Sequence, residues 1–97
     1  MNVRILPLAR NDLSQGYWFY EERAERLGEY FLSSLESEID ELAYQAGIHT
    51  KILGFYFVKH SARFPYSIYY FISAETVMVD AVIDQRRDPE WISERLN

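Results

Sequence analysis

The spacing of apolar side chains changes in the middle of the chain, and this change constrains the fold more than any other feature. Before Gly47, apolar residues recur every three or four positions, the period of an amphipathic helix. The first stripe is Leu13, Tyr17, Tyr20, Ala24 and Leu27, and the second is Phe31, Leu35, Ile39, Leu42 and Ala46. After Gly47, apolar and aromatic residues gather in short runs, which are typical of strands.

The first half therefore predicts a helical hairpin, and the second half predicts a sheet for it to cover. Gly28 interrupts the helical pattern and marks the expected turn, and Gly47 stands where a helix C-cap is expected. Short joints between the apolar runs indicate an antiparallel meander. Its expected strands are 52–58, 64–72 and 76–83.

Both ends of the chain add one element each. Val3 to Leu6 is an apolar strand ended by Pro7, and we expect it to join the same sheet. Asp88 and Pro89 are a strong N-cap and first-turn pair, so a short last helix begins there, anchored by Trp91 and Ile92. The prediction is one α+β domain over residues 1–97, in the order β-α-α-β-β-β-α, with the hairpin packed on a small antiparallel sheet.

Composition excludes several kinds of chemistry. The chain has no cysteine and two histidines, so neither a disulfide framework nor an HExxH or Cys/His metal site is possible. There is no glycine-rich phosphate loop and no G-x-S-x-G motif. We therefore expect no metal and no cofactor. No apolar run is long enough for a signal peptide or a membrane span, so we place the protein in the cytoplasm, away from membranes.

Charge is distributed unevenly. The net charge is −5, which argues against non-specific nucleic-acid binding. Residues 9–47 hold nine acids and three bases, a net charge of −6, whereas residues 48–97 hold six of each. No acid lies between Glu41 and Glu75. The simplest interpretation is a solvated helical face followed by ordinary strands.

Four segments together resemble the RelE/ParE toxin superfamily over essentially the whole chain. They are Ala9 with Asp12-Leu13 and Trp18-Phe19-Tyr20-Glu21, the strand Arg63-Phe64-Pro65-Tyr66-Ser67-Ile68-Tyr69-Tyr70, the strand 77–83, and the ending Arg86-Arg87-Asp88-Pro89-Glu90-Trp91. The resemblance implies a toxin encoded beside an antitoxin that binds and silences it, as in plasmid-stabilisation modules. RelE-like members cleave mRNA in the ribosomal A site, and ParE-like members act on DNA gyrase.

The long hairpin and the Arg-Asp-Pro ending look more like the ParE side. Asp84 stands where many relatives have a histidine, residues 55–58 are apolar where relatives carry bases, and the chain is acidic. These departures disfavour RNA cleavage. Whether the protein is an enzyme stays open at this point; if it is one, it is a metal-independent endoribonuclease.

Candidate contact residues follow from exposed cations and surplus aromatics. For the target they are Lys59, His60, Arg63, Arg86, Arg87 and Trp91, and for the antitoxin they are Trp18 and Phe19. Each has a plainer alternative: a polar turn for His60, a surface ion pair for Arg63, pairing with Asp84 and Asp88 for the two last arginines. No catalytic residue is assigned.

Three functions compete. The first is a gyrase-binding toxin, the second a ribosome-dependent endoribonuclease acting on mRNA, and the third a module that binds an antitoxin but has lost toxicity. Each predicts an antitoxin partner and a toxin–antitoxin hetero-oligomer.

Overall fold

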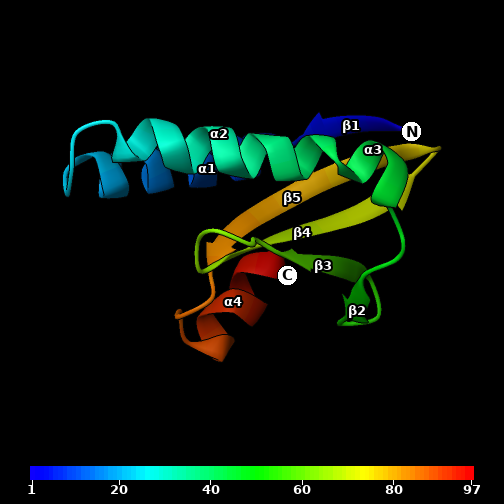
Figure 1. Cartoon of the computed structure of the whole chain (residues 1–97). Helices are drawn as coiled ribbons and strands as arrows, with labels where there is room; N and C mark the ends of the chain where they lie inside the picture. Colours follow the sequence, from blue (N-terminus) through cyan, green and yellow to red (C-terminus); the bar gives the residue numbers. More distant parts are fainter.

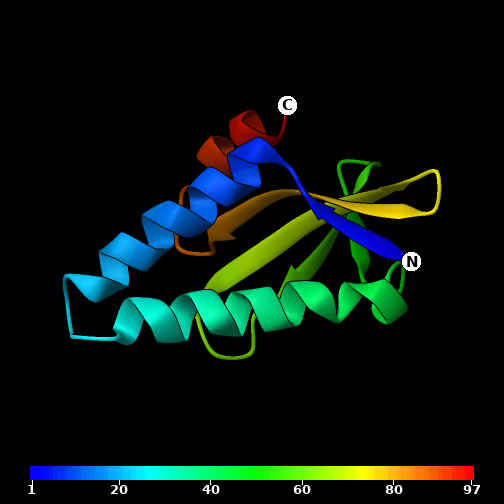
Figure 2. The ribbon, with the colours of Figure 1, turned by 90° about the horizontal axis from the view of Figure 1, so that it is seen from above.

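The computed structural model describes all 97 residues as a central sheet with helices on both faces. A helical hairpin covers one face, and the short C-terminal helix lies against the other (Figure 1). The elements are β1 (Asn2–Ile5), α1 (Pro7–Glu21), α2 (Leu27–Asp40), α3 (Leu42–Gln45), β2 (Thr50–Ile52), β3 (Tyr56–His60), β4 (Tyr66–Ser73), β5 (Thr76–Asp84) and α4 (Pro89–Leu96). Seen from above, α1 and α2 diverge from their connecting turn as a V over the sheet (Figure 2).

The sheet is mixed, whereas the sequence predicted an antiparallel one. Its strand order is β1-β5-β4-β3-β2, and the meander from β2 to β5 is antiparallel as expected. β1 joins this sheet, but it pairs with β5 in parallel, from Asn2 opposite Thr76 to Ile5 opposite Val79. The apolar pattern of a four-residue strand does not encode its direction, so the direction depends on the long path through the helices.

The predicted strand 52–58 is instead a hairpin. Leu53 and Gly54 have φ angles of 53° and 67°, and this pair of left-handed residues turns β2 back onto β3. Phe55 completes the turn by donating its N–H to the Ile52 carbonyl at 3.0 Å. The prediction was wrong because the apolar sequence Leu-Gly-Phe is typical of a strand. Tight hairpin turns of this kind usually contain Asn-Gly or Asp-Gly.

The hairpin turn also lies earlier than predicted. α1 ends at Glu21, so Ala24 is an exposed turn residue and not part of the stripe. Arg26, with φ 68°, precedes α2, and Gly28 lies inside that helix. Gly28 is needed for close packing: a Cβ there would lie 2.6 Å from the Tyr17 carbonyl oxygen and 2.9 Å from the Glu21 Cβ.

Replacing Gly28 by alanine is expected to lower the free energy of unfolding by about 2 kcal/mol, because the added methyl group meets a rigid backbone oxygen. Ser33→Ala, on the exposed side of the same helix, is the matched control and is expected to change little. Urea titrations monitored by circular dichroism measure both. Equal stability of the two variants would contradict this account of the packing.

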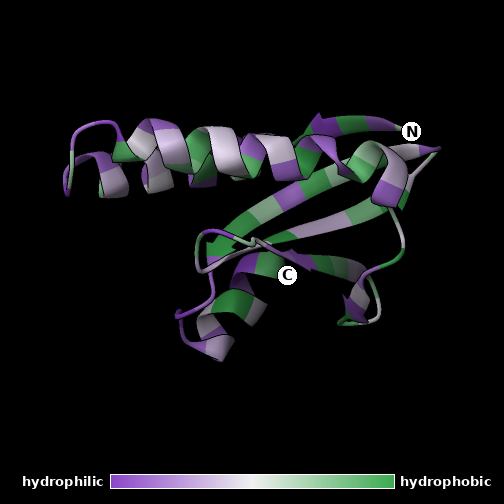
Figure 3. Ribbon diagram, viewed as in Figure 1, coloured by the Kyte–Doolittle hydropathy of each residue, from purple (hydrophilic) through white to green (hydrophobic).

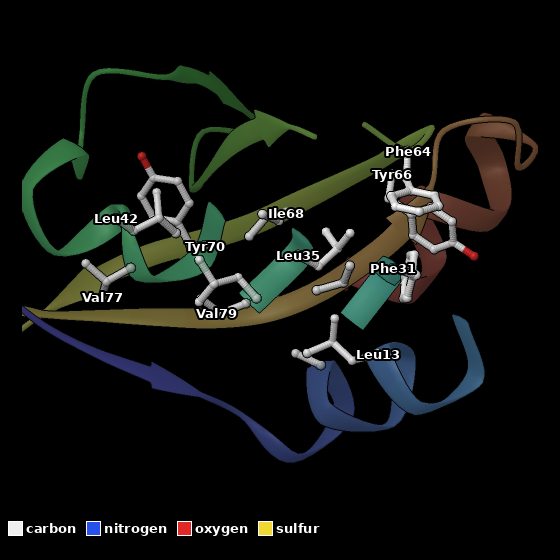
Figure 4. Packing of buried hydrophobic residues seen from close by; sticks show 13 residues of the cluster. Leu13, Phe31, Leu35, Leu42, Phe64, Tyr66, Ile68, Tyr70, Val77 and Val79 are labelled. Atoms are coloured by element: carbon white, nitrogen blue, oxygen red, sulfur yellow. The ribbon is translucent and has the colours of Figure 1, made fainter. Parts of the chain in front are cut away.

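The main core lies between the hairpin and the sheet. Figure 4 shows Phe31, Leu35 and Leu42 pointing toward Tyr66 and Tyr70. Hydrophobic residues recur between hydrophilic ones along α1 and α2, as amphipathic helices require (Figure 3). The opposite face holds a smaller cluster in which α4 contributes Ile92 and Leu96. The strand tyrosines divide as predicted: Tyr66 and Tyr70 face the hairpin, and Tyr69 faces α4.

Candidate protein-binding groove

A groove of about 340 Å³ runs between α1 and the end of the sheet that leads into α4. We call it the α1–α4 groove. It is lined by Asp12, Gln15, Gly16, Phe19, Tyr66, Val82, Ile83, Asp84, Arg87 and Trp91. Its α1 residues are Asp12, Gln15, Gly16 and Phe19, which share one side of the helix because they lie within three or four positions of one another.

The groove exists because β5 extends beyond its neighbour. β1 pairs with β5 only as far as Val79, so the last part of β5 has a free edge. The Asp12 carboxylate caps this edge by accepting the Val82 N–H at 2.9 Å. The same oxygen accepts a bond from Arg95 of α4 at 2.7 Å, and the two side chains are only 12% and 16% exposed. This ion pair fixes α4 to α1 and holds the two walls of the groove at a set distance.

Aromatic side chains form the two rims. Phe19 on α1 and Trp91 on α4 are each 38% exposed. Each has a guanidinium stacked on it: Arg23 lies 3.4 Å from the Phe19 ring centroid, and Arg87 lies 4.1 Å from that of Trp91. Trp91 does not anchor α4 as predicted, since Ile92 and Leu96 do so. The rims therefore present flat apolar surfaces beside positive charge.

Acidic groups around the groove are already neutralised. Asp84 accepts two hydrogen bonds from the Arg86 guanidinium, at 2.9 and 2.7 Å, which lower the pKa of its carboxyl. Asp88 caps α4 by accepting the Glu90 N–H at 2.8 Å, and it forms no ion pair with Arg87. Arg87 is left as the uncompensated charge of this cluster.

Tyr66 forms part of the groove floor, and burial raises its pKa to about 12. Burial and the bond to Asp80 raise the pKa of Tyr56 likewise to about 12.

Tyr66 and Tyr56 are therefore expected to be the last tyrosines to ionise in a spectrophotometric alkaline titration. A tyrosine whose pKa is raised on folding stabilises the folded state relative to its ionised form. This contribution to the free energy of unfolding is fully present below the unfolded-state pKa of about 10, and it is lost as pH rises toward the folded-state pKa of about 12. Tyr66→Phe should remove one late step and flatten the fall in stability over this window. Tyr44→Phe, at an exposed position of α3, should do neither. Retention of both late steps in Tyr66→Phe would contradict the assignment.

The other cations predicted as target contacts do not converge. The Lys59 side chain is 11% exposed and donates to the Glu38 carbonyl, Glu41 and Gln45 at 2.8 to 3.0 Å. It braces the sheet against α2 and α3, a placement at odds with contacting a target. His60 points to the opposite sheet face, where Nδ1 contacts Ser67 Oγ at 2.7 Å. Arg63 donates to the Tyr30 hydroxyl at 2.9 Å, beside α2.

The two candidate antitoxin residues lie on different surfaces. Phe19 lines the α1–α4 groove, whereas Trp18 is 58% exposed. The Trp18 ring lies edge-to-face with that of Tyr17, with 5.0 Å between the ring centroids. Successive helical residues are about 100° apart, which explains the separation. Sequence reasoning missed Asp12 and Arg95 as a pair, because no local pattern links residues 83 positions apart.

His, Asp and Glu side chains form no group of three that could hold a metal ion. None of the helices has both the length and the apolar character that crossing a membrane would require.

The fold and groove define a small α+β domain with a hairpin on one sheet face and a lone helix on the other. The same fold occurs in a chain of a solved structure described as "Chromosomal ParDE TA system from P. aeruginosa". The TM-score is 0.78 over 87% of this chain and 95% of that one, at 14% sequence identity. No family model matches the sequence, and no curated protein matches it significantly. The predicted α+β fold, with a helical hairpin on the sheet and a short C-terminal helix, is thus confirmed, and a chain of that ParDE system shares it.

Proposed function

We propose that this protein is the toxin component of a type II toxin–antitoxin module and that a segment of its antitoxin occupies the α1–α4 groove. The observation that carries the proposal is the pair of half-exposed aromatics, Phe19 and Trp91, facing one groove in a fold shared with a ParDE system chain. Aromatic anchors beside a pocket are the usual energetic centre of a protein interface.

The groove favours a helical occupant over an added strand. The outward N–H of Val82, which an added strand would need, is already bonded to Asp12. Arg87 and Arg23 on the rims attract carboxylates, while Asp12 and Asp84 are paired with arginines. An antitoxin helix with apolar residues on one side and acidic residues beside them fits this arrangement.

The target proposed is DNA gyrase, bound as a protein, and not mRNA cleaved on the ribosome. Cleavage without a metal needs a base, an acid and cations around one phosphate. Lys59 and His60 lie on opposite sheet faces, and Arg86 is paired with Asp84. Binding a protein requires only shape and a few anchors, such as Arg87 on Trp91.

Co-expression with the product of the neighbouring gene tests the antitoxin. We expect the two proteins to copurify and the pair to protect the α1–α4 groove in hydrogen exchange. A protein that stays alone in the presence of that product would contradict the proposal.

Two assays test the target: one with purified gyrase, and one that maps mRNA ends in cells after expression is induced. Purified gyrase should lose supercoiling activity with added protein, and mapped mRNA ends should show no A-site cleavage. A-site cleavage with normal supercoiling would overturn the choice of target. Neither effect, together with normal growth, would identify an antitoxin-binding module without toxicity.

A further inference from the structure

We propose that the outer face of the helical hairpin is a second docking surface, which binds a basic amphipathic helix of a partner protein. This surface is separate from the α1–α4 groove and goes beyond the function proposed above. It is defined by Trp18 and by a shallow groove of about 320 Å³ between α1 and α2, lined by Arg10, Leu13, Ser14, Tyr17, Leu32 and Glu36.

One large apolar side chain on this face, that of Trp18, is not used by the fold. Trp18 belongs to neither core cluster, and its indole ring lies edge-to-face with the ring of Tyr17. Tyr17 and Leu32 are half-buried at the groove floor. A tryptophan left outside both cores, next to an apolar groove, is the composition of an interface anchor.

Acidic side chains border the groove on the α2 side. Glu29, Glu36 and Asp40 are exposed and, at spacings of seven and four, form one stripe beside Leu32. None of the three makes a salt bridge, because the ion pairs of the chain use Glu41, Asp84 and Asp12. The turn beyond Trp18 holds exposed Glu22 and Glu25 together with exposed Arg23 and Arg26, so it adds no net charge and the negative charge lies in the α2 stripe. Arg10 is the cation that lines the groove.

Charge complementarity selects the occupant. Lysine and arginine side chains would pair with the free carboxylates and could stack on Trp18. Nucleic acid and anionic lipid would be repelled by the same stripe. A second copy docked through this face would oppose one acidic stripe to another, at a cost in free energy. A helix fits because apolar residues three and four apart can fill the groove while its basic side faces the carboxylates.

The experiment uses Trp18 as its own reporter. The chain has two tryptophans, so Trp91→Phe leaves Trp18 as the single source of indole fluorescence. The probe is a synthetic amphipathic helix with leucines on one side and lysines on the other. Its control peptide has glutamate at every lysine position. We expect saturable binding of the lysine peptide that weakens with added salt, and no binding of the glutamate peptide.

Variants are then compared by the anisotropy of labelled lysine peptide. Trp18→Ala should weaken binding about thirtyfold, and each of Glu29→Gln, Glu36→Gln and Asp40→Asn about two- to fivefold. Glu90→Gln with Glu94→Gln, exposed acids on α4, is the matched control and should have no effect. Phe19→Ala should also have no effect, which separates this surface from the α1–α4 groove.

Three results would overturn the proposal. The first is equal binding of the lysine and glutamate peptides. The second is a loss of affinity in the α4 control as large as in the α2 variants. The third is undiminished binding by Trp18→Ala. Sedimentation of the protein alone addresses the competing occupant: a dimer that Trp18→Ala dissociates would assign the face to a second copy.

Discussion

Replacing Arg95 by alanine is expected to lower the free energy of unfolding by about 3 kcal/mol at neutral pH. The change leaves the Asp12 carboxylate, 12% exposed, without its guanidinium partner. Loss of one member of a buried pair is costly because the remaining charge stays desolvated. The bond also ties α4 to α1, so we expect α4 to detach before the rest of the fold melts.

The pH dependence gives this prediction a second readout. Burial already raises the pKa of Asp12 with Arg95 present, and without that arginine the pKa should rise further. When folding raises the pKa of a carboxyl, the free energy of unfolding of the protein increases as pH falls through the folded-state pKa. Arg95→Ala should therefore regain part of its lost stability in mild acid. Asp12→Asn combined with Arg95→Ala should be more stable than Arg95→Ala alone, because no charge is left buried.

Denaturant titrations at several pH values measure these effects. Glu94→Ala, the exposed neighbour of Arg95, is the control and should change stability little. A loss in Arg95→Ala no larger than that of the control would show that the ion pair does not hold α4.

Combining Phe19→Ala with Trp91→Ala is expected to abolish antitoxin binding while leaving the fold intact. Each side chain is an exposed rim of the α1–α4 groove, and loss of an aromatic anchor typically weakens a complex about thirtyfold. Both losses together should release the antitoxin at working concentrations. This prediction depends on the proposed function.

Isothermal titration with the purified antitoxin measures the effect. Unchanged circular dichroism should accompany the loss, since neither residue belongs to a core cluster. Trp18→Ala is the matched control, an aromatic on the same helix outside the groove, and should retain the wild-type affinity. An equal loss of antitoxin affinity in the control and in the groove variant would contradict the proposal that the antitoxin binds in this groove.

The kinds and order of most elements could be predicted because each depends on local pattern. The stripe from Phe31 to Leu42 is buried, the strand tyrosines alternate across the sheet, and the Asp88 cap begins α4 at Pro89. Predictions failed where the local signal was ambiguous. Leu53-Gly54 makes a tight turn without the usual residues, and Gly28, taken for a turn, serves the close approach of two helices.

The sequence by itself determined that the chain forms a helical hairpin and a sheet, because apolar periodicity is a property of neighbouring residues. Only the tertiary structure decided what the polar and aromatic candidates do. The rotation of α1 about its axis places Phe19 in one groove and Trp18 on another surface. The register of β3 buries Lys59 beneath α2 and α3. The free edge of β5 brings Asp12 and Arg95 together across nearly the whole chain. These placements depend on how rigid elements pack against each other, and packing joins residues that no stretch of sequence connects.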